Sequence, residues 1–267
     1  MRAIWKGAIS FGLVNIPIAL YSAVKKEEVR FRMLRKSDLS PVLYRRVAET
    51  DGVEVPWEQV GKGYEYEKGR FILLSDEDFQ RVDLNSAQTI NIVDFVSLRE
   101  IDPILFDKPY YLEPQKGGAK AYALLRQVLQ ETGKVGIAKV VIKTRQYLAA
   151  VKSEGEILVL QLMHFADEIM PPDGLNVARD EQVSKRELDM AKTLVESMSD
   201  KWQPERYTDD YRNALLTMIE ERIQQGEKAA PKKAAKAPAG KVLDLVDILQ
   251  QSLAQTEKKK KARSKAA

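Results

Sequence analysis

The chain has 267 residues, of which 44% are hydrophobic and 31% charged, so it can bury one large core and lies near the upper limit for a single domain. It contains no cysteine, which excludes disulfides, a thiolate nucleophile and cysteine-ligated zinc. The net charge is +4, but residues 227–267 hold eleven Lys and Arg against four Asp and Glu, which leaves 32 against 35 in residues 1–226. A slightly acidic body must bind any polyanion through local basic patches.

The first twenty residues have the basic start and apolar content of a secretory signal, yet their apolar residues alternate with other side chains. The alternation runs over 3–11 and again over 14–20, with Pro17 inside the second run. A signal has a continuous apolar core, so we expect two β-strands instead. No other stretch approaches an uninterrupted membrane-spanning length. We therefore expect a cytoplasmic protein without a membrane partner.

A basic segment follows these strands. Apolar residues alternate with arginines over 29–33, which predicts a third strand with one basic face, and 41–47 is predicted to be its hairpin partner. Asp51 and Gly52 supply the next turn. The exposed basic residues of the segment are Arg30, Arg32, Arg35, Lys36, Arg45 and Arg46. Two interpretations remain open: a solvated strand edge that discourages aggregation, or a surface that contacts phosphates.

The middle of the chain is rich in predicted strands. They cover 71–74, 88–96, 110–112, 136–143, 146–152 and 157–165. Ser75 and Asp78 approximate a helix-starting capping box, and apolar residues at helical spacing predict a helix over 118–132 that ends at Gly133. So many strands with few helices between them favour an antiparallel barrel or sandwich over a parallel sheet.

The C-terminal third is predicted to be helical and then disordered. Helices over 181–199 and 209–225 would form a two-helix arm, about 175–225, that completes a core of residues 1–225. Residues 226–240, rich in Ala, Lys and Pro, are predicted to be a disordered linker. Within the tail, 241–267, a helical apolar stripe should fold on the body or on a partner. The stripe consists of Val242, Leu245, Val246, Leu249 and Leu253.

The basic end of the tail has two interpretations. It is either a solubility tail or a nucleic-acid contact, and its sign beside an amphipathic segment favours the second. Its basic residues are Lys258, Lys259, Lys260, Lys261, Arg263 and Lys265.

Candidate catalytic groups are few. The single histidine, His164, precedes Asp167 and Glu168, but a zinc site usually needs three or four ligands with more His or Cys. Ser10 lies in a weak likeness of a nucleophile elbow that lacks the following helix. The sequence contains no P-loop motif. We expect no cofactor, no metal and no enzyme activity.

Several long motifs, in one order from residue 1 to about 225, resemble the prokaryotic Ku family. They are the opening MRAIWKGAISFGLVNIP, then EVPW at 54–57, GYEYEKG at 63–69, KPYYLEP at 108–114, GIAKVV at 136–141 and FADEI at 165–169. The resemblance implies a β-barrel core with a DNA-encircling bridge at about 22–66, a helical arm and a basic tail. It departs from relatives that carry a Cys-x-x-Cys pair before the Pro-Trp motif.

The resemblance also implies a function. A ring-shaped homodimer would thread onto double-stranded DNA ends at the nucleoid, with the six basic residues of the bridge near phosphates. In non-homologous end joining, an ATP-dependent DNA ligase would bind the apolar stripe of the tail, and the basic end would contact DNA. Alternatives are a chromatin-like protein that coats any DNA, and a minor abasic-site lyase activity through a lysine Schiff base.

Overall fold

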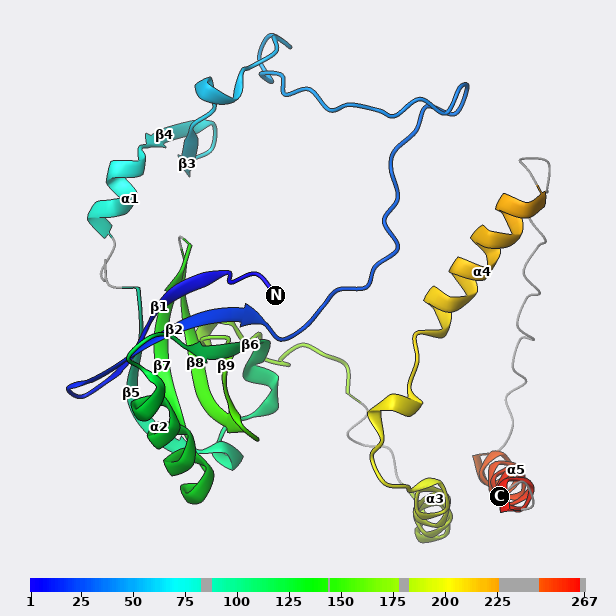
Figure 1. Ribbon diagram of the computed structural model, residues 1–267. Coiled ribbons are helices and arrows are strands. Elements are labelled where there is room, and N and C mark those ends of the chain that lie inside the picture. The colour runs from blue at the N-terminus through cyan, green and yellow to red at the C-terminus, as the bar shows by residue number, and fades with distance from the viewer. Residues whose placement is uncertain (83–87, 144, 178–182, 226–244, 265–267) are drawn as a thin grey trace. The chain divides into compact units, whose positions relative to one another are not determined.

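The computed structural model describes residues 1–82, 88–143, 145–177, 183–225 and 245–264. It contains two compact units, Met1–Pro172 and Asp173–Ala267, shown in Figure 1. The strands of the first unit are β1 (Trp5–Phe11), β2 (Val14–Ser22), β3 (Lys62–Glu67), β4 (Arg70–Leu74), β5 (Thr89–Ser97), β6 (Phe106–Pro114), β7 (Lys134–Ile142), β8 (Arg145–Glu154) and β9 (Ile157–Met163). Its α-helices are α1 (Asp76–Val82) and α2 (Ala119–Thr132), and the second unit contains α3 (Lys185–Met198), α4 (Asp210–Gln225) and α5 (Leu245–Ser264).

Seven strands close into a barrel in the order β1-β2-β6-β9-β8-β7-β5, which confirms the predicted β-barrel (Figure 1). All neighbours are antiparallel except β5 and β1, which pair in parallel through Ala8–Thr89, Ile9–Ile90 and Ser10–Asn91. A parallel pair needs a long crossover connection. Here residues 23–88, hereafter the excursion, leave the barrel after β2 and return to it before β5.

Alternation along each strand fills the barrel with branched apolar side chains. In β2, Ile16, Ile18 and Leu20 are fully buried, as expected for a strand with one face toward a core. Ile9 of β1, Leu112 of β6, and Leu158 and Leu160 of β9 are also fully buried and belong to the same cluster. The alternation that argued against a signal segment therefore marks two strands of the barrel.

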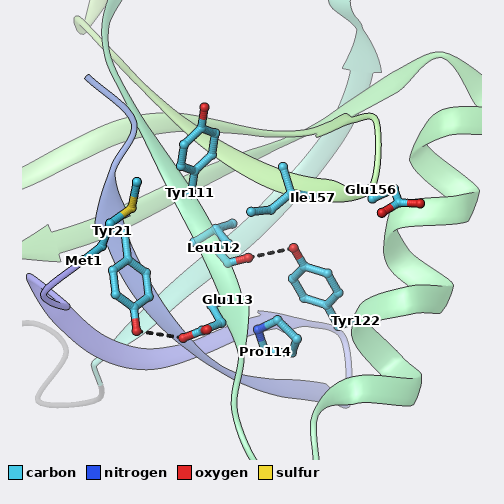
Figure 2. A pocket seen from close by; sticks show the side chains of 9 residues that line it. All are labelled: Met1, Tyr21, Tyr111, Leu112, Glu113, Pro114, Tyr122, Glu156 and Ile157. Carbon is cyan, nitrogen blue, oxygen red and sulfur yellow. Dashed lines mark hydrogen bonds between the residues drawn. The ribbon is translucent and has the colours of Figure 1, made fainter. Parts of the chain in front are cut away.

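Helix α2 packs against β2, β7 and β8 and ends where the sequence predicts. Gly133 follows it with φ +64°, the left-handed conformation that favours glycine at a helix C-terminus. Tyr122 links the helix to the barrel through two hydrogen bonds. Its hydroxyl donates to the Leu112 carbonyl oxygen at 2.6 Å and accepts from the Leu158 N–H at 2.7 Å. Figure 2 shows Tyr122 pointing at β6. Burial raises the pKa of Tyr122 above its ordinary value.

We expect Tyr122→Phe to lower the free energy of unfolding by about 1–3 kcal/mol, because it leaves two buried backbone groups without their partner. Tyr21→Phe is the matched control, since it removes only the solvent-exposed bond from the Tyr21 hydroxyl to Glu113 Oε2, 2.7 Å. That loss should stay within about 0.5 kcal/mol. Urea unfolding of both variants measures the difference. Equal losses would mean that Tyr122 does not anchor α2.

The strands predicted over 29–33 and 41–47 do not form, and this prediction was wrong. The two segments meet at an isolated bridge between Leu34 and Pro41. Two backbone bonds flank it, from the Val42 N–H to the Met33 carbonyl oxygen and from the Arg35 N–H to the Ser40 carbonyl oxygen. Pro41 has no N–H with which to extend a ladder. The predicted turn at Asp51–Gly52 is confirmed: Gly52 has φ +70°, and Val47 bridges to Glu54.

The rest of the excursion is more regular. Strands β3 and β4 form an antiparallel hairpin that turns at Gly69, φ +75°, and β3 was not predicted. Helix α1 begins at the predicted capping box: the Ser75 N–H donates to Asp78 Oδ2 at 2.9 Å, and the Asp78 N–H donates to Ser75 Oγ at 3.2 Å.

The second unit contains the two predicted helices of the arm, as α3 and α4. A capping box between Ser184 and Glu187 starts α3, so it begins later than the predicted Glu181. The predicted linker 226–240 lies outside the described residues. Helix α5 continues to Ser264, well past Leu253, the last residue of the predicted apolar stripe. Among the described helices, none is long and apolar enough to cross a membrane.

Candidate nucleic-acid interface

The first part of the excursion, residues 25–46, is largely exposed and rich in positive charge. Residues 25–46 contain eight Lys and Arg against three Asp and Glu, whereas 47–66 contain one against five. All six predicted phosphate-binding residues of the excursion are exposed. The structure divides them by what each side chain already contacts.

Arg35 and Arg45 are held by carboxylates. Arg35 Nε donates to Asp38 Oδ1 at 2.9 Å and its Nη2 to Oδ2 at 2.5 Å. These bonds, with smaller contributions from Ser40, hold the pKa of Asp38 well below its ordinary value. Arg45 Nη1 donates to Glu54 Oε2 at 2.8 Å across the Asp51–Gly52 turn. Neither guanidinium is free to contact a phosphate without sharing or releasing its carboxylate.

Arg46 is positioned by an aromatic ring. Its guanidinium carbon lies 4.9 Å from the centre of the Trp57 ring, within the range of a cation–π contact. In the part of the chain that the structure describes, the Arg46 guanidinium forms no side-chain hydrogen bond or ion pair besides this contact. Arg46 therefore retains both its charge and its hydrogen-bonding capacity.

Arg30, Arg32 and Lys36, hereafter the free triad, form no ion pair or side-chain hydrogen bond in the described part of the chain. They are exposed, and they lie within seven consecutive residues. Unpaired cations on an exposed chain attract a polyanion without the cost of breaking an existing pair. The free triad is the strongest part of the candidate interface.

The β3–β4 hairpin adds basic residues that the sequence analysis missed. Lys68 lies exposed at its turn, and Arg70 lies 5.3 Å from the Tyr66 ring while bonding Glu67 at 2.9 Å. Lys62 lies 4.7 Å from the Phe79 ring. The alternation of aromatic and charged residues in 63–69 is the sequence signal that indicates this hairpin.

The tail residues are described only in part. Lys258–Lys261 and Arg263 lie on α5, and Lys265 and Val242 lie outside the described residues. Leu245 is the first residue of α5, and Val246, Leu249 and Leu253 are half-buried on it. Helix α5 packs against α3.

The excursion also exposes large apolar side chains. Phe31 is 70% exposed, Leu43 87%, Tyr44 83% and Leu73 72%. So many apolar groups beside free backbone edges are typical of a surface that another chain covers. These four residues are hereafter the apolar excursion surface.

The remaining candidate sites do not suit catalysis or phosphate binding. His164 Nδ1 lies 3.8 Å from Glu168 Oε2, and Ser10 lies within β1, paired with Asn15. In the described ranges, three or more potential metal ligands do not gather anywhere, and charged side chains are not buried. A surface pocket of about 640 Å³ (Figure 2) is lined by Glu113 and Glu156 but by no Lys or Arg, so its side chains offer no cation to a phosphate.

Comparison with known proteins identifies the class. The family model for the Ku70/Ku80 beta-barrel domain matches residues 10–190. The chain is 58% identical over 268 aligned residues to the non-homologous end joining protein Ku of Opitutus terrae, covering 99% of this chain and 96% of that protein. It is 42% identical to the protein of that name from Cupriavidus necator (97% and 80% covered) and 39% identical to the one from Coxiella burnetii (97% of each). The chain belongs to the Ku family.

Proposed function

We propose that this chain is a non-homologous end joining protein that binds ends of double-stranded DNA. The observation that carries the proposal is the free triad, which is exposed and has no charged or hydrogen-bonded partner among the described residues, on an excursion that departs from a closed Ku barrel. The names of its relatives point to the same pathway. Lys and Arg that neutralise phosphates bind any sequence, with an affinity that falls as salt rises. The protein would act on DNA in the cytoplasm, at the nucleoid.

We further propose a ring-shaped homodimer. The apolar excursion surface and the sparse pairing of residues 23–60 suit an interface with a second copy, because an isologous contact covers the same surface on both chains. A preformed ring passes over a free end and cannot pass over a closed circle without opening. Sequence-independent binding then becomes specific for breaks.

In this proposal, the tail recruits an ATP-dependent DNA ligase. Val246, Leu249 and Leu253 recur along α5 at helical spacing, the pattern of an amphipathic helix that docks into a partner's groove. Lys258–Lys261 and Arg263 continue the same helix and would add contacts to DNA.

The test is a gel-shift titration on one duplex, presented either linear or as a closed circle, at physiological salt. Threading predicts strong preference for the linear form. Equal affinity for the two forms would remove the ring mechanism and favour a protein that coats DNA regardless of ends.

A further inference from the structure

Helices α3 and α5 bury matching faces. On α3 the half-buried positions are Glu187, Met190, Ala191, Leu194 and Ser197, and on α5 they are Val246, Leu249, Ser252, Leu253 and Thr256. Both sets recur at intervals of three and four, which is one face of a helix. The two helices pack against each other. In the described residues, α4 makes no comparable contact with either of them.

The sequence of α3 offers a wider apolar surface than α5 uses. Leu188 is 48% exposed, Val195 65% and Met198 67%, whereas Leu194 between them is half-buried. Neighbouring apolar residues of α3 therefore differ in exposure according to whether they face α5. Leu194 lies in the contact, and Val195 lies outside it.

A single chain can make this contact. Nineteen residues separate Gln225 from Leu245, and such a length spans at most roughly 70 Å. Because both helices belong to one chain, α5 meets α3 at a higher effective concentration than a separate molecule would. A weak helix–helix contact is then populated without a second molecule, and a helix that is marginal alone gains a surface on which to fold.

We propose that α3 is the receptor, within the same chain, for the tail helix α5, and that docking covers the stripe Val246, Leu249 and Leu253. This stripe is the one assigned above to the ligase, so the consequence for recruitment rests on the proposed function, whereas the docking does not. A partner that takes this face of α5 must displace α3. The apparent affinity of that partner is its intrinsic affinity multiplied by the fraction of tails that are undocked.

The test uses the full chain, whose lack of cysteine allows a single introduced thiol to be labelled. Ser252→Cys places the thiol at a half-buried position of α5, and Ala254→Cys places it at an exposed one. The Ser252→Cys thiol should react with a maleimide about tenfold more slowly, as for a helix docked for roughly nine-tenths of the time. Equal rates would overturn the proposal.

The cause of protection is tested by matched substitutions in α3. Leu194→Glu should remove the protection of the Ser252→Cys thiol, whereas Val195→Glu, one residue away and exposed, should keep it. Leu249→Glu breaks the contact from the tail side with α3 unaltered, and it should also release the thiol. Protection that survives Leu249→Glu would overturn the docking.

A complementation experiment separates one chain from two. Chains with Leu194→Glu and the reporter thiol are co-expressed with chains carrying Leu249→Glu. Docking within one chain predicts no recovered protection, and recovery would show that α5 binds a second copy. Loss of ligase binding in the Leu249→Glu chain is measured separately by pull-down. If the Ser252→Cys thiol is protected in a protein that recruits no ligase, the docking proposal stands and only the proposed recruitment of a ligase is contradicted.

Discussion

Replacing the free triad by Arg30→Gln, Arg32→Gln and Lys36→Gln should weaken binding to linear duplex more than tenfold at physiological salt. Each lost phosphate contact removes about 0.9 from the slope of log affinity against log salt, so six contacts in a dimer would remove up to about 5. The side chains are exposed, and among the described residues they form no ion pair or side-chain hydrogen bond that their removal would break. The stability of the fold should therefore stay unchanged. Fluorescence anisotropy across a salt series measures the slope.

The matched control is a second basic triad of exposed residues, Lys185, Arg186 and Lys192 on α3. Changing these three to Gln removes the same total charge and should leave the slope nearly unaltered. An equal loss in both triple variants would mean that net charge, and not the excursion, determines binding. Arg35→Gln and Arg45→Gln should have intermediate effects, since both residues already pair with carboxylates.

Leu43→Asp combined with Tyr44→Asp should convert a dimer to a monomer and abolish the preference for ends. Both side chains are more than four-fifths exposed, at 87% and 83%, so the substitutions cost little within one chain. An interface that must bury them cannot accept two desolvated charges in each subunit, at several kcal/mol per charge. Sedimentation equilibrium measures the mass, and the linear-versus-circular titration measures the preference.

The control is Leu175→Asp, which places a charge at another exposed leucine, 68% exposed, in the second unit. It should leave the mass and the preference unaltered. A doubly substituted protein that remains dimeric would place the dimer contact away from the apolar excursion surface.

The sequence predicted strands correctly where a strand has neighbours within the barrel. The alternation in 3–11 and 14–20 became β1 and β2 because β5 and β6 flank them. The same alternation in 29–33 produced no strand, since periodicity reports two unlike faces and does not supply a pairing partner. Helix α5 continued through the lysine run because Glu, Lys, Ala and Arg are all good helix formers.

Which basic residues contact a carboxylate or an aromatic ring was harder to predict from the sequence. Arg35 and Asp38 are three residues apart, and Arg45 meets Glu54 across a turn that the sequence did predict. Both pairs were therefore within reach of sequence reasoning. The stacking of Arg46 on Trp57 depends on the path of the intervening chain, which no local pattern specifies. The apolar stripe of the tail was recognised, but its partner α3 was not, because helical spacing identifies a face without identifying what covers it.

The parallel pairing of β1 with β5 affects how the length of the excursion can vary. Strand β1 lies between β2 and β5, and β2 ends at the same end of the barrel at which β5 begins. The two ends of the excursion are separated by two strand spacings across the sheet. Because Leu20 pairs with Trp5 and Thr89 with Ala8, they are also offset by about five residues along the strands, which makes the separation roughly 20 Å. The entropy of closing such a loop grows only logarithmically, by about 0.6 kcal/mol for each doubling of length. Insertions or deletions at its far end can therefore change the length of the excursion at almost no cost to the barrel that carries it.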